Sequence, residues 1–263
     1  MEETTAIEKT MAEESSTRRP RSFMRRLHYW WSLFLAGALL GLLGPPILLV
    51  AWLVNKHDLV YPWATLGARL WLRLSGVRVV VKGLELLDPK QTYVFVSNHR
   101  SYLDTATLFI FTGRRIGILA KKELLKVPVL GVGMGFVNVM AIDRSNRERA
   151  IRTTEAAAER IRSGISFGVF VEGTRAQPGE LLPFKKGAFY MARQAVPVVP
   201  VAIKHSDELM GKGTGEAKSG TIEMVLMKPV PTTDVATDED INRLIADVRG
   251  SIANELGLRE VVS

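Results

Sequence analysis

His99 and Asp104 are the two residues of this sequence whose types and spacing most favour acid–base chemistry. Residues five apart on one continuous helix point in different directions, whereas residues three or four apart share a face. We therefore expect His99 to lie in a turn and Asp104 in the first turn of the helix that follows. An aspartate placed there can accept a hydrogen bond from one imidazole nitrogen and leave the other nitrogen free as a base.

The residues around this pair predict a strand, a turn and a helix. Residues 93–96 are aromatic and β-branched without a helical period, which predicts a buried strand that ends at Ser97. Apolar residues recur at helical spacing from Tyr102 onward, and Ser101 is a favourable N-cap type. His99 would then lie at the carboxyl end of a strand, where open α/β sheets bind their ligands.

The sequence offers no enzyme nucleophile to accompany the histidine. It contains no cysteine, and its Gly-x-Ser-x-Gly match at residues 164–168 does not indicate a nucleophilic serine elbow, because a strand and not a helix is predicted to follow that serine. A histidine base without such a nucleophile suits direct transfer, in which the base deprotonates a hydroxyl group of the acceptor substrate. The alternative is structural: Asn98 and Ser101 would cap the helix, and Asp104 would favour the helix dipole.

Residues 98–104 resemble the His-x4-Asp block of the glycerolipid acyltransferase family. Three later segments resemble the second, third and fourth blocks of that family in the same order: residues 141–144, 170–175 and 196–201. Residues 184–189 are similar to the segment between the last two blocks in the 1-acylglycerol-3-phosphate acyltransferase branch. The family usually has a glycine shortly before the arginine of the second block, where this chain has Asn138-Val139-Met140.

The resemblance implies an enzyme that moves a fatty acyl group from a thioester, on coenzyme A or acyl carrier protein, to the sn-2 hydroxyl of lysophosphatidic acid. The product would be phosphatidic acid. His99 is expected to be the general base and Asp104 to orient it. Neither a metal nor a cofactor beyond the thioester co-substrate is expected. Three alternatives remain: glycerol 3-phosphate as acceptor, another lysophospholipid as acceptor, or a membrane protein that binds acidic lipids without catalysis.

Arg144 and Arg175 are the candidates for binding the acceptor phosphate. Each follows a predicted strand, over residues 137–142 and 167–171. Two guanidinium groups at neighbouring strand ends suit bidentate phosphate binding, and Lys185 could add a positive charge.

The third block also contains Glu172, Gly173 and Thr174, which we include among the candidate substrate-binding residues. Gly173 would permit a tight turn after the strand. Glu172 would either hydrogen-bond a glycerol hydroxyl or hold Arg175 in place. His205 lacks a partner at a diagnostic spacing, so we expect it to be a surface residue.

The charge distribution predicts a membrane partner. A net charge of +8 and a pI of about 9.8 imply an anionic partner, either nucleic acid or a lipid surface. Five arginines occur within residues 18–26, and residues 29–54 carry no formal charge. A basic cluster beside an apolar run is typical of a membrane segment with a cytoplasmic flank, and no nucleic-acid-binding signature occurs elsewhere.

We divide the chain into three parts. Residues 1–22 should form a disordered tail, residues 23–75 membrane-embedded and interfacial helices, and residues 76–263 an α/β acyltransferase domain. The domain should contain a mixed, mostly parallel sheet flanked by helices. We expect it at the cytoplasmic face of a cell membrane, with a bacterial inner membrane as the simplest assignment.

Pro45-Pro46 interrupts the apolar run, so its helix should kink or reverse there. A kinked single span and a helical hairpin that re-enters the same leaflet are both possible, and we favour the hairpin. Further along, the glycine-rich residues 128–136 predict a close-packed apolar turn that borders a tunnel for an acyl chain.

Overall fold

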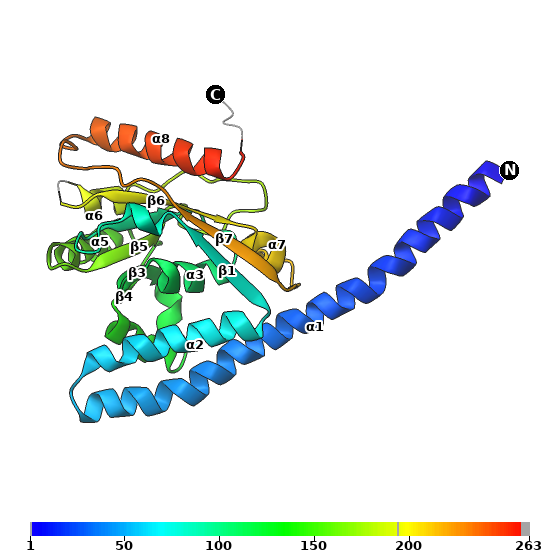
Figure 1. The fold of residues 1–263 in the computed structure, drawn as a ribbon, viewed down its shortest axis with the longest axis horizontal. Coiled ribbons are helices and arrows are strands. Elements are labelled where there is room, and N and C mark those ends of the chain that lie inside the picture. The colour runs from blue at the N-terminus through cyan, green and yellow to red at the C-terminus, as the bar shows by residue number, and fades with distance from the viewer. Residues whose placement is uncertain (1, 194, 259–263) are drawn as a thin grey trace.

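The computed structural model describes the backbone of residues 2–193 and 195–258, and the side chains from Ser22 onward. A seven-stranded sheet runs through the domain, in the order β1-β7-β6-β2-β5-β3-β4 (Figure 1). The β6–β7 pair is antiparallel and the other neighbouring strands are parallel. The predicted mixed, mostly parallel sheet is therefore confirmed. Its strands are β1 Val77–Lys82, β2 Val94–Ser97, β3 Ile116–Lys121, β4 Val139–Ile142, β5 Ser166–Phe170, β6 Val198–Lys204 and β7 Gly220–Leu226.

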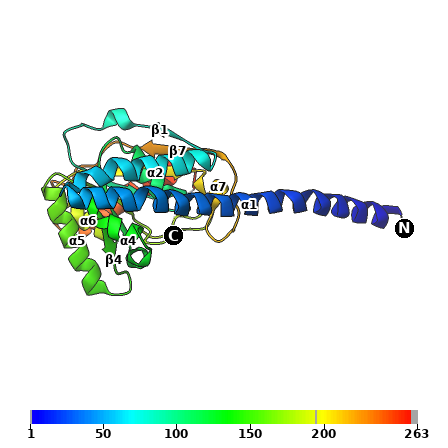
Figure 2. The same cartoon turned by 90° about the horizontal axis from the view of Figure 1, so that it is seen from below.

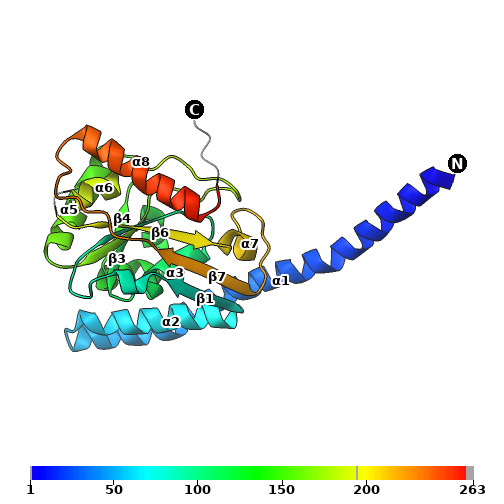
Figure 3. The same cartoon turned by 45° about the horizontal axis from the view of Figure 1, so that its top comes forward.

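Helices cover both faces of this sheet, with α8 on one side and the antiparallel α1 and α2 on the other (Figure 3). The α-helices are α1 Glu2–Leu53, α2 Val60–Leu74, α3 Leu103–Phe111, α4 Leu130–Met134, α5 Arg147–Arg162, α6 Gly187–Ala192, α7 Ser206–Met210 and α8 Asp238–Glu255. Short 3-10 segments are η1 His57–Leu59, η2 Leu84–Leu86, η3 Lys122–Lys126 and η4 Gly135–Val137.

The central strand β2 contributes side chains to two hydrophobic clusters. Phe95 packs in the cluster that contains α2 and α3, whereas Val94 and Val96 pack in the cluster that contains α5, α6 and α8. These three side chains are fully buried. A strand buried on both faces has no polar alternation, which is why residues 93–96 form a continuous apolar run. The two clusters hold the carboxyl end of β2 rigidly between layers.

The helical hairpin is built from α1 and α2, which lie side by side beneath the domain (Figure 2). The prediction that the chain reverses at Pro45-Pro46 is wrong, because α1 continues through both prolines to Leu53. Proline removes a backbone hydrogen bond and normally kinks a helix. Here the helix beyond the prolines is held by packing, since Leu48 and the fully buried Ala51 join the core cluster.

A polar contact between Ser32 and Ser75 fixes α1 to the domain. Their hydroxyl oxygens are 2.8 Å apart and both side chains are buried. The indole nitrogen of Trp71 donates to the Ser32 carbonyl at 2.9 Å, and His28 Nε2 lies 3.0 Å from the Ser75 carbonyl. Buried polar groups specify one arrangement only when they are paired, as these are. The hairpin is thus attached at a defined position.

The structure extends α1 to Glu2, where the sequence predicted a disordered tail over residues 1–22. Glutamate is frequent in this segment and is a good helix former, which is consistent with a helical backbone. The side chains before Ser22 lie outside the described residues.

Ser22–Leu53 is the one described helical segment that is long and apolar enough to cross a membrane, and an 18-residue window within it has a mean hydropathy of 2.3. Large apolar side chains on it stay exposed, among them Trp30, Trp31, Phe34, Leu42 and Trp52. The second arm, α2, buries Val60, Tyr61 and Leu72 against the domain and exposes Trp63 and Leu66. Both packing and an exposed apolar face therefore account for its amphipathic pattern.

Candidate active site

The predicted contact between His99 and Asp104 is present in the turn after β2. Nδ1 of His99 lies 2.9 Å from Oδ2 of Asp104. The same oxygen accepts the backbone N–H groups of Arg100 and Ser101, each at 2.7 Å. Asp104 is completely buried at the start of α3. The carboxylate therefore holds both the backbone of the turn and the orientation of the imidazole.

The His99 ring is positioned from three sides. It stacks on Phe170 at the end of β5, with ring centres 4.1 Å apart and planes 20° from parallel. Its backbone N–H donates to Oε1 of Glu172 at 2.7 Å, and its carbonyl accepts the N–H of Ala176 at 2.8 Å. The side chain is 15% exposed, and no described group hydrogen-bonds its Nε2. That nitrogen is therefore free to meet a substrate.

Glu172 holds the backbone of the turn and does not hold Arg175. Its Oε1 accepts from His99 and its Oε2 accepts the N–H of Leu182 at 2.7 Å. The structure shows no ion pair between Glu172 and Arg175 among the described residues, so that predicted contact is wrong. Burial raises the pKa of the Glu172 carboxyl above its ordinary value, against the opposing effect of the two N–H donors. Direct contact of Glu172 with an acceptor hydroxyl stays a prediction.

Gly173 brings Arg144 and Lys185 together. Its φ of +72° lies in the left-handed region, which favours glycine. A guanidinium nitrogen of Arg144 donates to the Gly173 carbonyl. A Cβ atom at Gly173 would lie 3.4 Å from Cγ of Lys185. Two of the predicted cations therefore converge on one backbone turn, while Thr174 is exposed beside it.

Arg144 and Arg175 do not follow neighbouring strands, contrary to the expectation from the sequence. β3 lies between β4, which precedes Arg144, and β5, which precedes Arg175. Strand order differs from sequence order in this sheet, so adjacency along the chain misled the prediction. Arg144 still reaches the β5 end because its long side chain extends across to Gly173.

The end of β4 is itself fixed by an ion pair. Asp143 lies 2.8 Å from Nζ of Lys122, which follows β3, and it also accepts from Ser145. These contacts hold the pKa of the Asp143 carboxyl well below its usual range. Arg144 is therefore placed by a charged link between the two strand ends.

Arg175 makes a different set of contacts. Its guanidinium carbon lies 3.7 Å from the centre of the Tyr102 ring, and its Nη1 is buried without a hydrogen-bond partner among the described residues. Nζ of Lys212 donates to the Arg175 carbonyl at 2.6 Å. Sequence reasoning missed Tyr102 and Lys212 as site residues. An aromatic residue inside the His-x4-Asp block was a usable signal for Tyr102, but Lys212 had none.

His205, in contrast, is an exposed residue that pairs with Glu208, as expected of a surface histidine. The catalytic candidates are thus restricted to the turn after β2.

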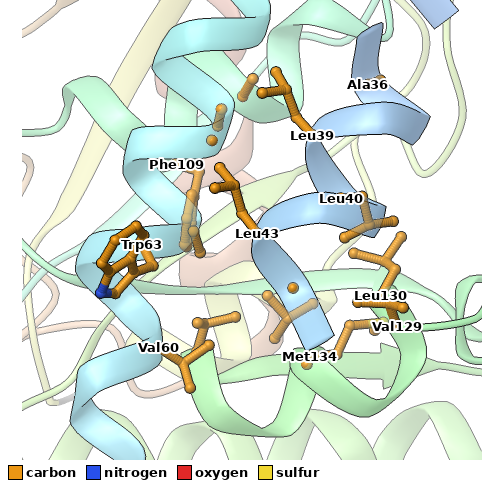
Figure 4. A pocket seen from close by; sticks show the side chains of 18 of the residues that line it. Ala36, Leu39, Leu40, Leu43, Val60, Trp63, Phe109, Val129, Leu130 and Met134 are labelled. Carbon is orange, nitrogen blue, oxygen red and sulfur yellow. The ribbon is translucent and has the colours of Figure 1, made fainter. Parts of the chain in front are cut away.

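An apolar cavity of about 400 Å³ lies between the helical hairpin and the domain. Leu39, Leu40 and Leu43 line it from α1, and Trp63 lines it from α2 (Figure 4). Tyr102, just before α3, and Phe109 within α3 also line it. Another part of its wall is formed by Val129, Leu130, Gly133, Met134, Val137 and Val139. The cavity thus reaches the helix that begins beside His99. The segment over residues 128–136 does border an apolar space, but it is mostly helical, in α4 and η4, where the sequence predicted a turn.

Comparisons with known proteins agree with this geometry. The profile of the family described as Acyltransferase matches residues 78–204. An uncharacterized acyltransferase from Schizosaccharomyces pombe is 38% identical over 183 residues, which cover 68% of this chain and 65% of the relative. The human 1-acyl-sn-glycerol-3-phosphate acyltransferase alpha is 37% identical over 182 residues, with 68% and 64% covered. The match thus spans just under two thirds of the length of these two relatives.

Two further similarities extend over more of the chain. The 1-acyl-sn-glycerol-3-phosphate acyltransferase of Saccharomyces cerevisiae is 33% identical over 242 residues, which cover 88% of this chain and 78% of the relative. The crystal structure of the 1-acyl-sn-glycerophosphate (LPA) acyltransferase PlsC from Thermotoga maritima superposes with a TM-score of 0.77 at 25% identity. That comparison covers 91% of this chain and 98% of the other.

Proposed function

Because this chain belongs to the PlsC-like acyltransferase family, we propose that it transfers a fatty acyl group from a thioester to the sn-2 hydroxyl of lysophosphatidic acid, giving phosphatidic acid. The observation that carries the proposal is the contact of 2.9 Å between His99 and Asp104. It leaves one imidazole nitrogen free in a turn that is held by hydrogen bonds from the β5 end and from α3. The names of the relatives support the choice of acceptor.

In this reaction His99 Nε2 removes the proton from the acceptor hydroxyl as its oxygen attacks the thioester carbonyl carbon. The carbon–sulfur bond then breaks, and the departing thiolate takes the proton from the imidazolium. Asp104 stabilises the imidazolium and fixes the tautomer. No covalent acyl-enzyme is required, in keeping with the absence of cysteine from the sequence.

Arg144, Arg175 and Lys185 bind the phosphate of the acceptor in this proposal. Guanidinium groups offer paired N–H donors that match phosphate oxygens, and lysine adds a point charge. Glu172 and Gly173 contribute by shaping the backbone between these cations and His99. Thr174 lies exposed at the same turn and is assigned to the acceptor site with them.

The apolar cavity holds an acyl chain. Its wall is almost entirely apolar and includes α1, whose exposed tryptophans suit the interface of a phospholipid bilayer. A lipid acceptor and a fatty acyl donor would therefore reach the site from the membrane. Coenzyme A and acyl carrier protein are both admissible carriers of the thioester. A cytoplasmic orientation in a bacterial inner membrane is part of the same proposal.

A panel of acceptors tests the function. The purified full-length protein, in phospholipid vesicles, is supplied with acyl-CoA or acyl carrier protein thioester and with lysophosphatidic acid, glycerol 3-phosphate or lysophosphatidylcholine, and thiol release is followed. We expect the highest kcat/KM with lysophosphatidic acid. A preference for another acceptor would replace the proposed substrate, and no thiol release with any acceptor would favour a lipid-binding protein without catalysis.

A further inference from the structure

Tyr102 lies between the phosphate-binding candidate Arg175 and the apolar cavity. The Arg175 guanidinium carbon is 3.7 Å from the centre of the Tyr102 ring, and Tyr102 also lines the cavity. The residue is 45% exposed, so burial in the core does not explain why an aromatic ring stands there. The ring and the guanidinium come from two segments, one after β2 and one after β5.

We propose that Tyr102 is a positioning residue that holds Arg175 in the orientation needed to bind the acceptor phosphate. The inference rests on the proposed function, because it takes Arg175 to be a phosphate ligand. It adds a residue that acts through Arg175 and does not itself touch the reacting atoms.

Stacking and phosphate binding use different parts of the guanidinium group. An aromatic ring attracts the flat face of the cation, whereas phosphate oxygens bind the N–H groups that project in its plane. Nη1 of Arg175 is buried and has no hydrogen-bond partner among the described residues. The stacked side chain therefore does not use this donor on any described protein group.

The backbone of Arg175 is held at the same time. Lys212 donates to its carbonyl at 2.6 Å, and the following residue, Ala176, donates to the carbonyl of His99 at 2.8 Å. With the main chain fixed at both points, stacking on the Tyr102 ring restricts the remaining freedom of the long side chain. A cation held in advance loses less entropy when the phosphate binds.

The position of Tyr102 in the chain links the phosphate site to the base. Tyr102 lies between His99 and Asp104, directly after the two backbone amides that bond to the Asp104 carboxylate. The ring that supports Arg175 therefore belongs to the same rigid turn that carries the imidazole.

A matched control distinguishes this role from simple lining of the cavity. Trp63 lines the same cavity from α2 and is similarly exposed, at 44%, but no cation stacks on it among the described residues. Replacing either aromatic residue by leucine alters the cavity wall. Only the change at Tyr102 removes the support of Arg175.

The experiment measures KM for lysophosphatidic acid and kcat for the full-length protein in vesicles of fixed phospholipid composition. Tyr102→Leu and Tyr102→Met remove the ring, and we expect each to raise the acceptor KM by roughly 3- to 30-fold with little change in kcat. Tyr102→Phe keeps the ring and should stay within about twofold of the wild type. Trp63→Leu measures what an altered cavity wall alone does to the acceptor KM, and each ring-removing change at Tyr102 should raise that KM clearly further. Thermal unfolding of each variant checks that it is folded.

A double variant tests the route of the effect. If Tyr102 acts through Arg175, combining Tyr102→Leu with Arg175→Ala should raise the acceptor KM no further than Arg175→Ala alone. An unchanged KM in folded Tyr102→Leu or Tyr102→Met, while Arg175→Ala raises it, would overturn this inference and leave the proposed function intact. An unchanged KM in Arg175→Ala would instead remove the phosphate assignment on which the inference rests.

Discussion

The side-chain amide of Asn98 forms two hydrogen bonds with the backbone of Ile203. Its Oδ1 accepts the Ile203 N–H at 2.8 Å, and its Nδ2 donates to the Ile203 carbonyl at 2.9 Å. The paired register of β2 with β6 ends at Ser97 and Val201, so Asn98 extends the contact by one further step. The turn that carries His99 is thus anchored to β6 through Asn98 and to the β5 end through Glu172.

Replacing Asn98 with alanine should destabilise the protein and slow catalysis. Two buried backbone groups of Ile203 would lose their partners, and each such loss costs about 1–3 kcal/mol. We also expect kcat to fall, because the turn before His99 loses its anchor to β6. Chemical unfolding and steady-state kinetics on the same preparation measure both effects.

Thr237→Ala is the control for Asn98→Ala. Thr237 caps α8 by accepting the backbone N–H of Asp240, away from the His99 turn. Losing this cap should cost about 1 kcal/mol of stability without changing kcat. If Asn98→Ala lost stability and kept full kcat, the anchor would be structural only.

Gly173→Ala should impair the acceptor site, because backbone strain at this residue displaces the carbonyl that accepts a hydrogen bond from Arg144. A left-handed conformation costs roughly 1–2 kcal/mol for a residue with a Cβ atom. Gly179 has a similar φ, +81° against +72°, but a Cβ atom added there would meet nothing within 4 Å, whereas one added at Gly173 would meet Lys185. We expect both alanine variants to lose stability and only Gly173→Ala to raise the KM for lysophosphatidic acid. If Gly173→Ala and Gly179→Ala had equal KM values for lysophosphatidic acid, the turn at Gly173 would have no role in phosphate binding.

Gly44 permits α1 to approach the wall of the cavity. A Cβ atom there would lie 2.2 Å from Cγ1 of Val129, which has itself an unusual φ of +65°. Such strain, of order 1–3 kcal/mol, persists only where the surroundings hold it. Gly44→Ala should therefore lower the unfolding temperature and displace the cavity wall, which would change the preference for acyl-chain length.

Gly41→Ala is the matched control on the same helix, because nothing lies within 4 Å of the corresponding Cβ position. Alanine favours a helix over glycine by about 0.5–1 kcal/mol, so this variant should be at least as stable as the wild type. Indistinguishable melting temperatures and chain-length profiles for the two variants would contradict the assigned contact.

Glu172→Gln should change how stability depends on pH. Burial raises the pKa of Glu172 above its ordinary 4.5, so the folded protein binds this proton more tightly than the unfolded chain does. The associated stability is fully present below pH 4.5 and is lost as pH rises through the raised value. The melting temperature of the wild type minus that of Glu172→Gln should therefore fall between acidic and neutral pH. A difference that grows with pH would show that the N–H donors of His99 and Leu182 outweigh burial.

The sequence predicted the His99–Asp104 contact because a turn followed by a helix is the geometry that lets a five-residue spacing close. It could not predict the partners of Glu172, which are backbone amides brought together by the fold. The separation of Arg144 from Arg175 by β3 likewise depends on strand order, which chain order does not specify.

The sequence predicted a hairpin whose second helix begins at Pro45-Pro46, whereas the second helix is α2, which begins at Val60. Proline weakens a helix locally, but the packing of Ala51 and Leu48 against the domain continues α1 beyond Pro46. The tolerance of Asn138 for a left-handed φ of +57° explains how this chain manages without the glycine that its family usually has before the second-block arginine. At the two prolines, local propensity predicted a break in the helix, and packing against the domain kept the helix continuous.

The general-base role of His99 is tested most directly by measuring acyl transfer to lysophosphatidic acid with purified wild type and His99→Ala in the same vesicles. General-base catalysis contributes about 10²–10⁴-fold, so the variant should lose at least about a hundredfold in kcat while it keeps the wild-type unfolding temperature within a few degrees. A folded His99→Ala protein that transfers acyl groups at close to the wild-type rate would contradict the account.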